Sequence, residues 1–544
     1  MEYVELSGKI VDLFNQTIQP GVIEIENERI RRVRHTPNVP DLYITPGFID
    51  AHVHIESSML VPSEFARLAV VHGTVATVSD PHEIANVLGI EGVRFMIENS
   101  KKVNFKCFFG APSCVPATPF ETAGAVIEAR DMEALINDPD IHYLAEMMNW
   151  PGVLHEDPEV MAKIQLAHGA GKPVDGHAPG LMGDRAAAYI RAGITTDHEC
   201  FTREEALDKL THGMKVIIRE GSAAKNFDAL IGLLPEYRDQ VMFCSDDKHP
   251  DNLVEGHINQ LLQRGVSAGI DPLVLLQAAC KNPVDHYGLN VGLLRPGDPA
   301  DLVVLKDLQA FEALQTYING YLVASQGKSH IESVAVGALN KFETSLKSSE
   351  EFKVQASGEE IKVMIAEDGQ LITKAQIHKA KIEDGQAVSD IQRDLLKITV
   401  VNRYQQAKPA MGFVRNFGLK KGAIASSVAH DSHNIIAVGV DDTALCRAVN
   451  AVINCGGGVA AVTDDQEMVL PLPVAGLMST NDGYEVANAY TEIDRFAKSL
   501  GSDLEAPFMT LSFMALLVIP ELKLSDKGLF DGLKFQFTEL FPDS

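Results

Sequence analysis

Positive charge is scarce in this 544-residue chain, in which 47 Lys and Arg residues stand against 74 Asp and Glu residues for a formal net charge of −27. Such a chain repels phosphate groups, so we expect no general binding to nucleic acid or to a membrane surface and favour a small-molecule substrate. No apolar run is long enough to span a bilayer. The first residues, Met1 to Glu5, lack the basic and apolar regions of a signal peptide, and we therefore expect a cytoplasmic protein.

Cysteine is also sparse. The seven Cys residues are an odd number, and no two of them are spaced as Cys-x-x-Cys. This usage predicts neither a disulfide framework nor a zinc ribbon, and we interpret the cysteines as small core residues. The missing spacing also excludes the cytidine-deaminase type of zinc site, which uses His-x-Glu followed by Pro-Cys-x-x-Cys.

The chain is too long to fold around a single hydrophobic core, so we expect two to four domains. Its 46% hydrophobic and 22% charged residues are typical of globular domains. Residues 1–43 contain short stretches in which apolar and polar residues alternate, a pattern that predicts antiparallel β-structure. From Phe48 onward, short apolar runs alternate with helical stretches, which predicts an α/β fold built on a parallel (β/α)8 TIM barrel. The expected strands are residues 48–54, 74–79, 105–111, 143–148, 172–177, 194–199, 214–219 and 241–245. The expected helices include 62–72, 89–100, 158–169 and 203–213.

The ends of the expected strands carry a set of metal-ligating side chains. His52 and His54 are two residues apart in the first strand, so both imidazoles project to the same face. Later strand ends add Glu146, His177, His198 and Asp246. Each residue alone is also compatible with a satisfied core histidine or a buried ion pair, but the joint pattern in strand order favours two divalent ions that share a bridging carboxylate. The oxygen-rich, cysteine-free set favours Mn(II) or Fe(II) over Zn(II).

Two segments resemble known signatures. The run PGFIDAHVH at 46–54 is similar to the first-strand signature of the amidohydrolase superfamily, and GLLRPGDPADLVVL at 292–305 is similar to the segment that leaves its barrel. Within that superfamily the chain resembles the bacterial adenine deaminase family over nearly its whole length. The distinguishing segments are AHVHIESSM at 51–59, SDPHEIANV at 79–87, APGL at 178–181, SDDKHP at 245–250, AHDSHN at 429–434 and LPLPVAGL at 470–477.

The resemblance implies a domain organisation and an activity. It implies a composite β-sandwich from residues 1–47 and 293–342, a metal-dependent barrel at 48–292, and a C-terminal α/β domain at 345–544. In that last region we expect strands at 397–401, 434–440 and 458–463 and helices at 443–453 and 481–500. The implied reaction is the hydrolysis of adenine to hypoxanthine and ammonia in purine salvage, through hydroxide attack at C6. A homo-oligomer is expected for a large enzyme of this kind.

The resemblance also suggests individual roles. His52 and His54 would hold one metal ion with Asp246, His177 and His198 would hold the second, and Glu146 would bridge the two. Asp246 is either a ligand only, or a ligand that also passes the proton released on attack to the leaving amine.

Several further side chains allow two interpretations. Glu83 either hydrogen-bonds the purine or delivers a proton to its N1, or it caps the helix that begins near Ile84, where a carboxylate favours the positive end of the dipole. Asp247 either contacts the substrate ring or caps a helix, and Glu56 and Ser57 are candidates for supporting the substrate. The polar segment at 430–433 is either a turn before a strand or a further metal or substrate contact, if the C-terminal domain folds over the barrel mouth.

Two other functions remain open. Another amidohydrolase acting on a cyclic amide or an N-acyl group would keep the same ligands, although the bridge position here is Glu146 rather than the lysine that some such enzymes carbamylate. A catalytically inactive scaffold is disfavoured because all six expected ligands are present.

Overall fold

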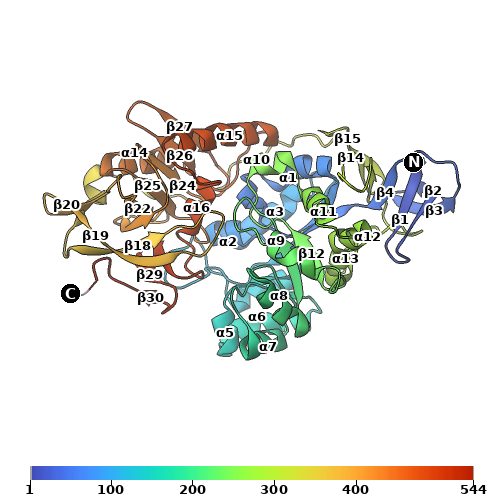
Figure 1. The fold of residues 1–544 in the computed structure, drawn as a ribbon, viewed down its shortest axis with the longest axis horizontal. Coiled ribbons are helices and arrows are strands. Elements are labelled where there is room, and N and C mark those ends of the chain that lie inside the picture. The colour runs from blue at the N-terminus through green and yellow to red at the C-terminus, as the bar shows by residue number, and fades with distance from the viewer. Residues whose placement is uncertain (1–2, 543–544) are drawn as a thin grey trace.

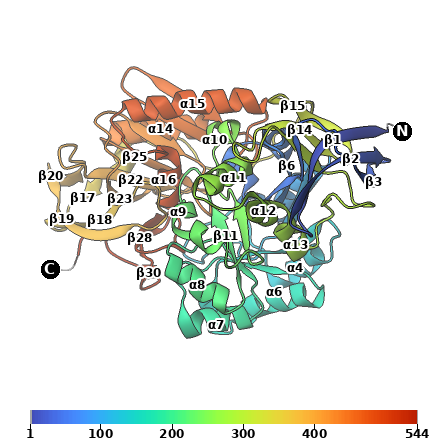
Figure 2. The ribbon, with the colours of Figure 1, turned by 45° about the vertical axis from the view of Figure 1, so that its right-hand side comes forward.

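The computed structural model describes residues 3–542, and its two ends lie on opposite sides of the molecule (Figure 1). Parallel strands and helices from the first half of the chain form the centre. A β-sheet containing the N-terminal strands lies at one side, and a sheet with helices from the last third of the chain lies at the other (Figures 1 and 2). Among the described residues, no helix is long and apolar enough to cross a membrane.

All eight strands expected between residues 48 and 245 are present in the central region. They form a curled five-stranded parallel sheet of order β5-β6-β7-β8-β9 and a three-stranded parallel sheet of order β10-β11-β12. Single parallel bridges pair Val174 with Ile194 and Val53 with Asp246, and these bridges link the two sheets at both ends. The strands are β5 Phe48–Val53, β6 Thr74–Ser79, β7 Lys106–Ala111, β8 Ile141–Met147, β9 Val174–Gly176, β10 Thr196–Asp197, β11 Lys215–Arg219 and β12 Val241–Cys244.

Helices connect these strands. The expected helix at 158–169 has those bounds as α6, whose first turn is capped because Asp157 accepts hydrogen bonds from the N–H groups of Glu159 and Val160. The expected helix at 62–72 is divided into α1 and a 3-10 turn, Val70–His72, that ends at Gly73 with φ +85°. The helices are α1 Pro62–Ala69, α2 His82–Leu88, α3 Ile90–Ser100, α4 Ala129–Ile136, α5 Trp150–Leu154, α6 Pro158–Gly169, α7 Gly183–Arg191, α8 Arg203–Thr211, α9 Phe227–Leu230, α10 Pro250–Glu255, α11 Ile258–Ser267, α12 Pro272–Leu276 and α13 Asn282–Tyr287.

Segments before and after the central strands share one eight-stranded sheet of order β16-β15-β14-β13-β4-β1-β2-β3. Its junction is β4, which pairs in parallel with β1 and antiparallel with β13. This sheet therefore joins the first residues of the chain to those that follow α13. Its strands are β1 Val4–Asp12, β2 Thr17–Glu26, β3 Arg29–His35, β4 Tyr43–Pro46, β13 Leu302–Leu305, β14 Ala313–Ile318, β15 Tyr321–Ser325 and β16 Lys328–Ser329.

The C-terminal region contains a second eight-stranded sheet, of order β19-β18-β23-β22-β25-β24-β26-β27, and two three-stranded sheets. The expected strands and helices are present here within two residues of their predicted bounds. The elements are β17 Val354–Gln355, β18 Glu360–Ile365, β19 Lys374–Lys379, β20 Lys381–Glu383, β21 Gln386–Val388, β22 Leu396–Val401, β23 Ala410–Arg415, β24 Ala423–Ser426, β25 Ile435–Gly439, α14 Asp442–Asn454, β26 Gly458–Val462, β27 Glu467–Pro471, α15 Gly483–Ser499, α16 Pro507–Phe513, β28 Leu522–Ser525, β29 Gly528–Asp531 and β30 Gln536–Phe537.

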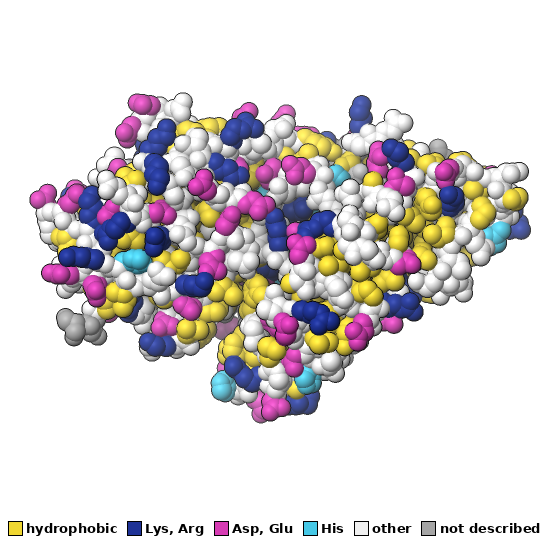
Figure 3. Space-filling model, in the orientation of Figure 1, with side chains coloured by type: hydrophobic (Ala, Val, Ile, Leu, Met, Phe, Trp, Pro, Cys, Tyr) yellow, Lys and Arg dark blue, Asp and Glu magenta, His cyan; other side chains and the backbone are white. Residues whose placement is uncertain are grey.

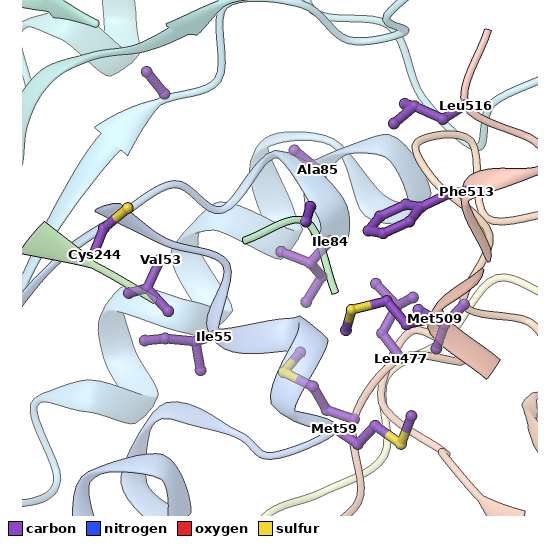
Figure 4. Close-up of a cluster of buried hydrophobic side chains, with 14 of the residues drawn as sticks. Val53, Ile55, Met59, Ile84, Ala85, Cys244, Leu477, Met509, Phe513 and Leu516 are labelled. Carbon is purple, nitrogen blue, oxygen red and sulfur yellow. The ribbon is translucent and has the colours of Figure 1, made fainter. Parts of the chain in front are cut away.

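The central and C-terminal regions pack through apolar side chains. Figure 4 shows Met59 and Ile84 from the central region facing Leu477, Met509 and Phe513 from the C-terminal region. These residues belong to one buried hydrophobic cluster. Burial of such side chains stabilises the contact by roughly 1.5–3 kcal/mol for each large residue, so the two regions are held against each other.

Charged side chains of both signs are interspersed on the face seen in Figure 3. No large area of a single charge sign stands out on this face.

Candidate active site

The six side chains predicted to bind metal converge at one end of the parallel strands. Each of them is at most 5% exposed, and all except the fully buried His52 line one small pocket. The residues are His52, His54, Glu146, His177, His198 and Asp246. They come from the ends of β5, β8, β9, β10 and β12, which is the edge where functional side chains gather in parallel α/β folds.

Glu146 lies at the centre of the cluster. Its Oε1 is 3.4 Å from His54 Nε2, whereas its Oε2 is 2.9 Å from His177 Nδ1 and 3.1 Å from His198 Nε2. Each carboxylate oxygen thus faces a different group of imidazoles. Burial opposes the charge of Glu146, but His177 and its neighbours hold the pKa of this carboxyl well below the usual range.

Asp246 completes the other side of the cluster. Its Oδ1 is 3.1 Å from His54 Nε2 and 3.7 Å from His52 Nε2. Its backbone has φ 52°, a left-handed conformation that Asp tolerates better than most residues, and its N–H donates to the carbonyl of His52. Although burial opposes ionisation, Arg219 and then His198 hold the pKa of Asp246 well below the usual range.

The donor set fits divalent metal ions. His54 Nδ1 lies 3.1 Å from the carbonyl oxygen of Asp80, which places the ring proton on Nδ1 and leaves a lone pair on Nε2 toward the cluster. Nε2 of His54 is only 3.2 Å from Nε2 of His52, and a cation between the two rings would accept the lone pairs of both nitrogens. His52, His54 and Asp246 offer ligand atoms within 4.8 Å of one another, as do His52, Glu146 and His198.

Arg219 and Glu199 are part of the site although sequence reasoning did not select them. Nη1 of Arg219 donates to both Glu199 Oε1 and Asp246 Oδ2, and Glu199 Oε1 is also 3.5 Å from His177 and His198. Burial disfavours the Arg219 charge, yet Asp246 and Glu199 raise its pKa above the usual value. A charged side chain at the end of a buried strand was the only sequence signal for either residue.

The sixth predicted strand is shorter than expected because the chain turns toward the site. β10 contains only Thr196 and Asp197. The Asp197 carboxylate accepts a hydrogen bond from the N–H of Glu199 at 3.0 Å, a local turn that ends the strand and presents His198 to Glu146. Asp80 makes the same kind of turn by accepting from the N–H of His82 at 3.0 Å.

Glu83 lies in the first turn of α2, but its carboxylate contacts the C-terminal region. Its Oε1 is 2.5 Å from His430 Nδ1 and its Oε2 contacts His433 Nε2. Burial opposes its charge, while His430 and then His433 hold the pKa of Glu83 well below the usual range. The polar segment at 430–433 therefore lies at the pocket, and the interpretation as a plain turn is incomplete.

The other expected supporting residues have different places. Ser57 Oγ donates to Asp247 Oδ1 at 2.5 Å, and Asp247 lines the pocket. Glu56 Oε1 instead accepts from the N–H of Ile84 at 3.2 Å, at the start of α2, and burial raises its pKa to about 7. Within residues 3–542, neither Glu56 nor Ser57 belongs to the lining of the pocket.

The C-terminal region closes the pocket over the strand ends. It contributes apolar side chains and two members of the polar segment: Leu371, Phe513, Leu516, His430 and Asp431. The His430 ring lies 5.4 Å from the ring of Phe513, between centroids. The lining of the pocket therefore comes from both the central strands and the C-terminal region.

Known proteins share both halves of this arrangement. The amidohydrolase family model matches residues 43–323, and the adenine deaminase C-terminal domain model matches residues 370–536. Adenine deaminase of Salinibacter ruber is 54% identical over 99% of both chains, and adenine deaminase of a Sulfurovum species is 55% identical over 98% of this chain and 99% of its own. A solved N-acetyl-D-glucosamine-6-phosphate deacetylase from Mycobacterium smegmatis is 16% identical, covers 59% of this chain and 100% of its own, and has a TM-score of 0.47.

The strand-end cluster and the family match together define the class of the protein, which is an amidohydrolase. Identity near one half over almost the full length, together with the C-terminal match, narrows the class further. The chain belongs to the adenine deaminase family.

Proposed function

We propose that this protein is an adenine aminohydrolase that converts adenine and water to hypoxanthine and ammonia, and that it acts in purine salvage. The observation that carries the proposal is the position of Glu146, whose two oxygens face separate imidazole groups in a chain of the adenine deaminase family. That geometry suits a carboxylate bridging two ions.

The metal centre is proposed to hold two divalent ions. His52 and His54 with Asp246 would bind one, His177 and His198 would bind the other, and Glu146 would bridge them. The absence of cysteine among these six ligands, which are four imidazoles and two carboxylates, is the ground for proposing Mn(II) or Fe(II) over Zn(II). When bound, the pair of ions would lower the pKa of water and supply hydroxide near neutral pH.

Side chains of the site transfer the protons and orient the substrate. Arg219 keeps Asp246 ionised, so that its carboxylate accepts a proton of the attacking water and returns it to the leaving amine as ammonia. Glu83 delivers a proton to ring nitrogen N1, beside C6, and regains a proton from water. Asp247, which accepts a hydrogen bond from Ser57, contacts the substrate ring, and Glu56 holds the start of α2 in place by accepting from the N–H of Ile84.

The architecture behind this site is proposed to be a complete (β/α)8 barrel at 48–292. The two sheets and the bridges that link them support closure. We likewise propose the composite β-sandwich at 1–47 and 293–342 and the C-terminal domain at 345–544. The homo-oligomer and the cytoplasmic location stay predictions.

The test is ammonia release by chelated protein reloaded with manganese, using adenine, adenosine, guanine, cytosine and dihydroorotate in parallel. We expect metal-dependent turnover of adenine alone. Turnover of dihydroorotate in place of adenine would identify another amidohydrolase activity. If the protein binds two ions but turns over none of these compounds, the proposed activity is contradicted and a catalytically inactive scaffold is favoured.

A further inference from the structure

The segment between β24 and β25 brings two imidazoles to one carboxylate. His430 Nδ1 is 2.5 Å from Glu83 Oε1, and His433 Nε2 contacts Glu83 Oε2. All three side chains are at most 3% exposed. Each oxygen of this buried carboxylate therefore contacts an imidazole of the C-terminal region.

The proton on His433 can be assigned from its second nitrogen. Nδ1 of His433 accepts a hydrogen bond from the N–H of Ala429 at 3.2 Å, so Nδ1 carries a lone pair. The ring proton then lies on Nε2, the nitrogen that contacts Glu83 Oε2. The same tautomer leaves no lone pair on Nε2, so Glu83, His430 and His433 form a hydrogen-bonded group rather than a third metal site, although their ligand atoms lie close enough for one.

His430 lies between two carboxylates. Nδ1 faces Glu83 and Nε2 lies 3.9 Å from Asp247 Oδ1, so an imidazole with protons on both nitrogens matches its surroundings. Burial opposes that charge, but Glu83 and then Asp247 raise the pKa of His430 to about 9. Other titratable groups also lie beside this cluster: Asp431 Oδ1 is 4.0 Å from His430 Nδ1, His82 Nε2 is 3.4 Å from Glu83 Oε1, and His249 lines a small cavity together with His430.

We propose that His430 and His433 are positioning residues for Glu83, each donating an N–H to one of its carboxylate oxygens, so that the C-terminal region completes the catalytic site of the central strands. The inference rests on the proposed function, in which Glu83 exchanges a proton with the purine. Without the two donors, Glu83 would be a buried carboxylate free to rotate away from the substrate.

The test compares two replacements of His433 in the full-length, manganese-loaded protein. His433→Gln keeps an amide N–H near the place of Nε2, whereas His433→Leu removes the donor. We expect His433→Leu to lower kcat for adenine about 10- to 100-fold with KM changed less than about threefold and two ions still bound, and His433→Gln to recover at least half of that loss on a logarithmic scale. His430→Asn and His430→Leu, matched to Nδ1, should behave in the same way.

The control is His286→Leu, a part-buried histidine that contacts Thr195 outside the pocket and should leave kcat unchanged. Unchanged kcat in His433→Leu would overturn the proposal. So would equal losses in the Gln and Leu variants of His433, because a donor would then have no role.

A second measurement does not depend on turnover. In a double-mutant cycle, the urea midpoint of unfolding is measured for Glu83→Gln, His433→Leu and the double variant. If the two side chains interact, the shift of the double variant should differ clearly from the sum of the two single shifts. Additive shifts would overturn the inference. Wild-type protein that fails to deaminate adenine but gives a non-additive cycle would instead contradict the proposed function and leave the Glu83 contact supported.

Discussion

Glu83 Oε1 lies 2.5 Å from His430 Nδ1, although 347 positions separate the two residues in the sequence. One belongs to α2 beside the parallel strands, and the other precedes β25 of the C-terminal sheet. A buried charged pair of this kind requires that both regions stay in place, which their shared apolar cluster provides (Figure 4). The pocket is thus a joint product of two regions that are far apart in sequence.

Asp246→Asn should lower adenine turnover by about 10²- to 10⁴-fold, because the amide cannot accept the proton released from water. Samples must be compared at equal metal content, measured by elemental analysis, since Asp246 also faces His52 and His54. Near-normal turnover with metal bound would show that Asp246 is a ligand without a proton-transfer role.

Glu146→Gln should reduce both metal content and rate, because an amide supplies one neutral oxygen where the carboxylate offers two charged ones. The expected result is less than two ions per chain after dialysis. A fully loaded dinuclear centre in this variant would contradict the bridging position of Glu146.

Much of the central region was predictable because buried parallel strands are short apolar runs between helices. β6 has its predicted bounds, residues 74–79, and the ligand-bearing ends of β5, β8 and β12 were placed within two residues. β10 ends two residues before its predicted end because Asp197 accepts a hydrogen bond from the N–H of Glu199, a turn that apolar periodicity cannot indicate.

The rest of the site depends on contacts between distant segments. Arg219 is charged and ends a buried strand, but only the fold shows that it joins Glu199 to Asp246. Glu83 was compatible with a helix cap until the position of His430 was known. Such pairings are long-range and leave no periodic pattern in the sequence.

Arg219→Met should destabilise the protein by about 3–5 kcal/mol, because it leaves the buried carboxylates of Glu199 and Asp246 without their shared cation. Chemical denaturation of apoprotein measures this directly. Arg219→Lys keeps the charge but replaces the planar guanidinium with an ammonium group whose donors lie on one nitrogen, so it should recover part of the lost stability. Equal stability of Arg219→Met and wild type would mean that the guanidinium is not needed to hold the two carboxylates.

Lys523 gives a pH-dependent prediction. It is fully buried in β28, its Nζ donates to the carbonyls of Leu371 and Phe513 at 2.7 and 2.9 Å, and burial lowers its pKa from 10.5 to about 7. Between pH 7 and 10.5 the unfolded chain binds a proton that the folded chain lacks. The contribution of Lys523 to the free energy of unfolding therefore rises with pH in this window, by at most about 1.4 kcal/mol per pH unit.

Lys523→Met removes this pH-dependent contribution. The free energy of unfolding of the variant minus that of wild type should therefore be highest near pH 7 and should decline toward pH 10. Urea unfolding of both proteins at pH 7, 8.5 and 10 measures the trend. Lys534→Met, at a side chain that is 70% exposed, is the control and should follow wild type at every pH. A stability difference for Lys523→Met that stays constant over this range would mean that Lys523 keeps its ordinary pKa in the folded protein.

The most direct test of the central claim is a titration of metal-free protein with Mn(II) while ammonia release from adenine is followed. The six converging ligands, with Glu146 between them, predict activity that rises until two equivalents are bound per chain and then stays constant. Saturation at one equivalent, or full adenine turnover by the metal-free protein, would contradict a dinuclear centre.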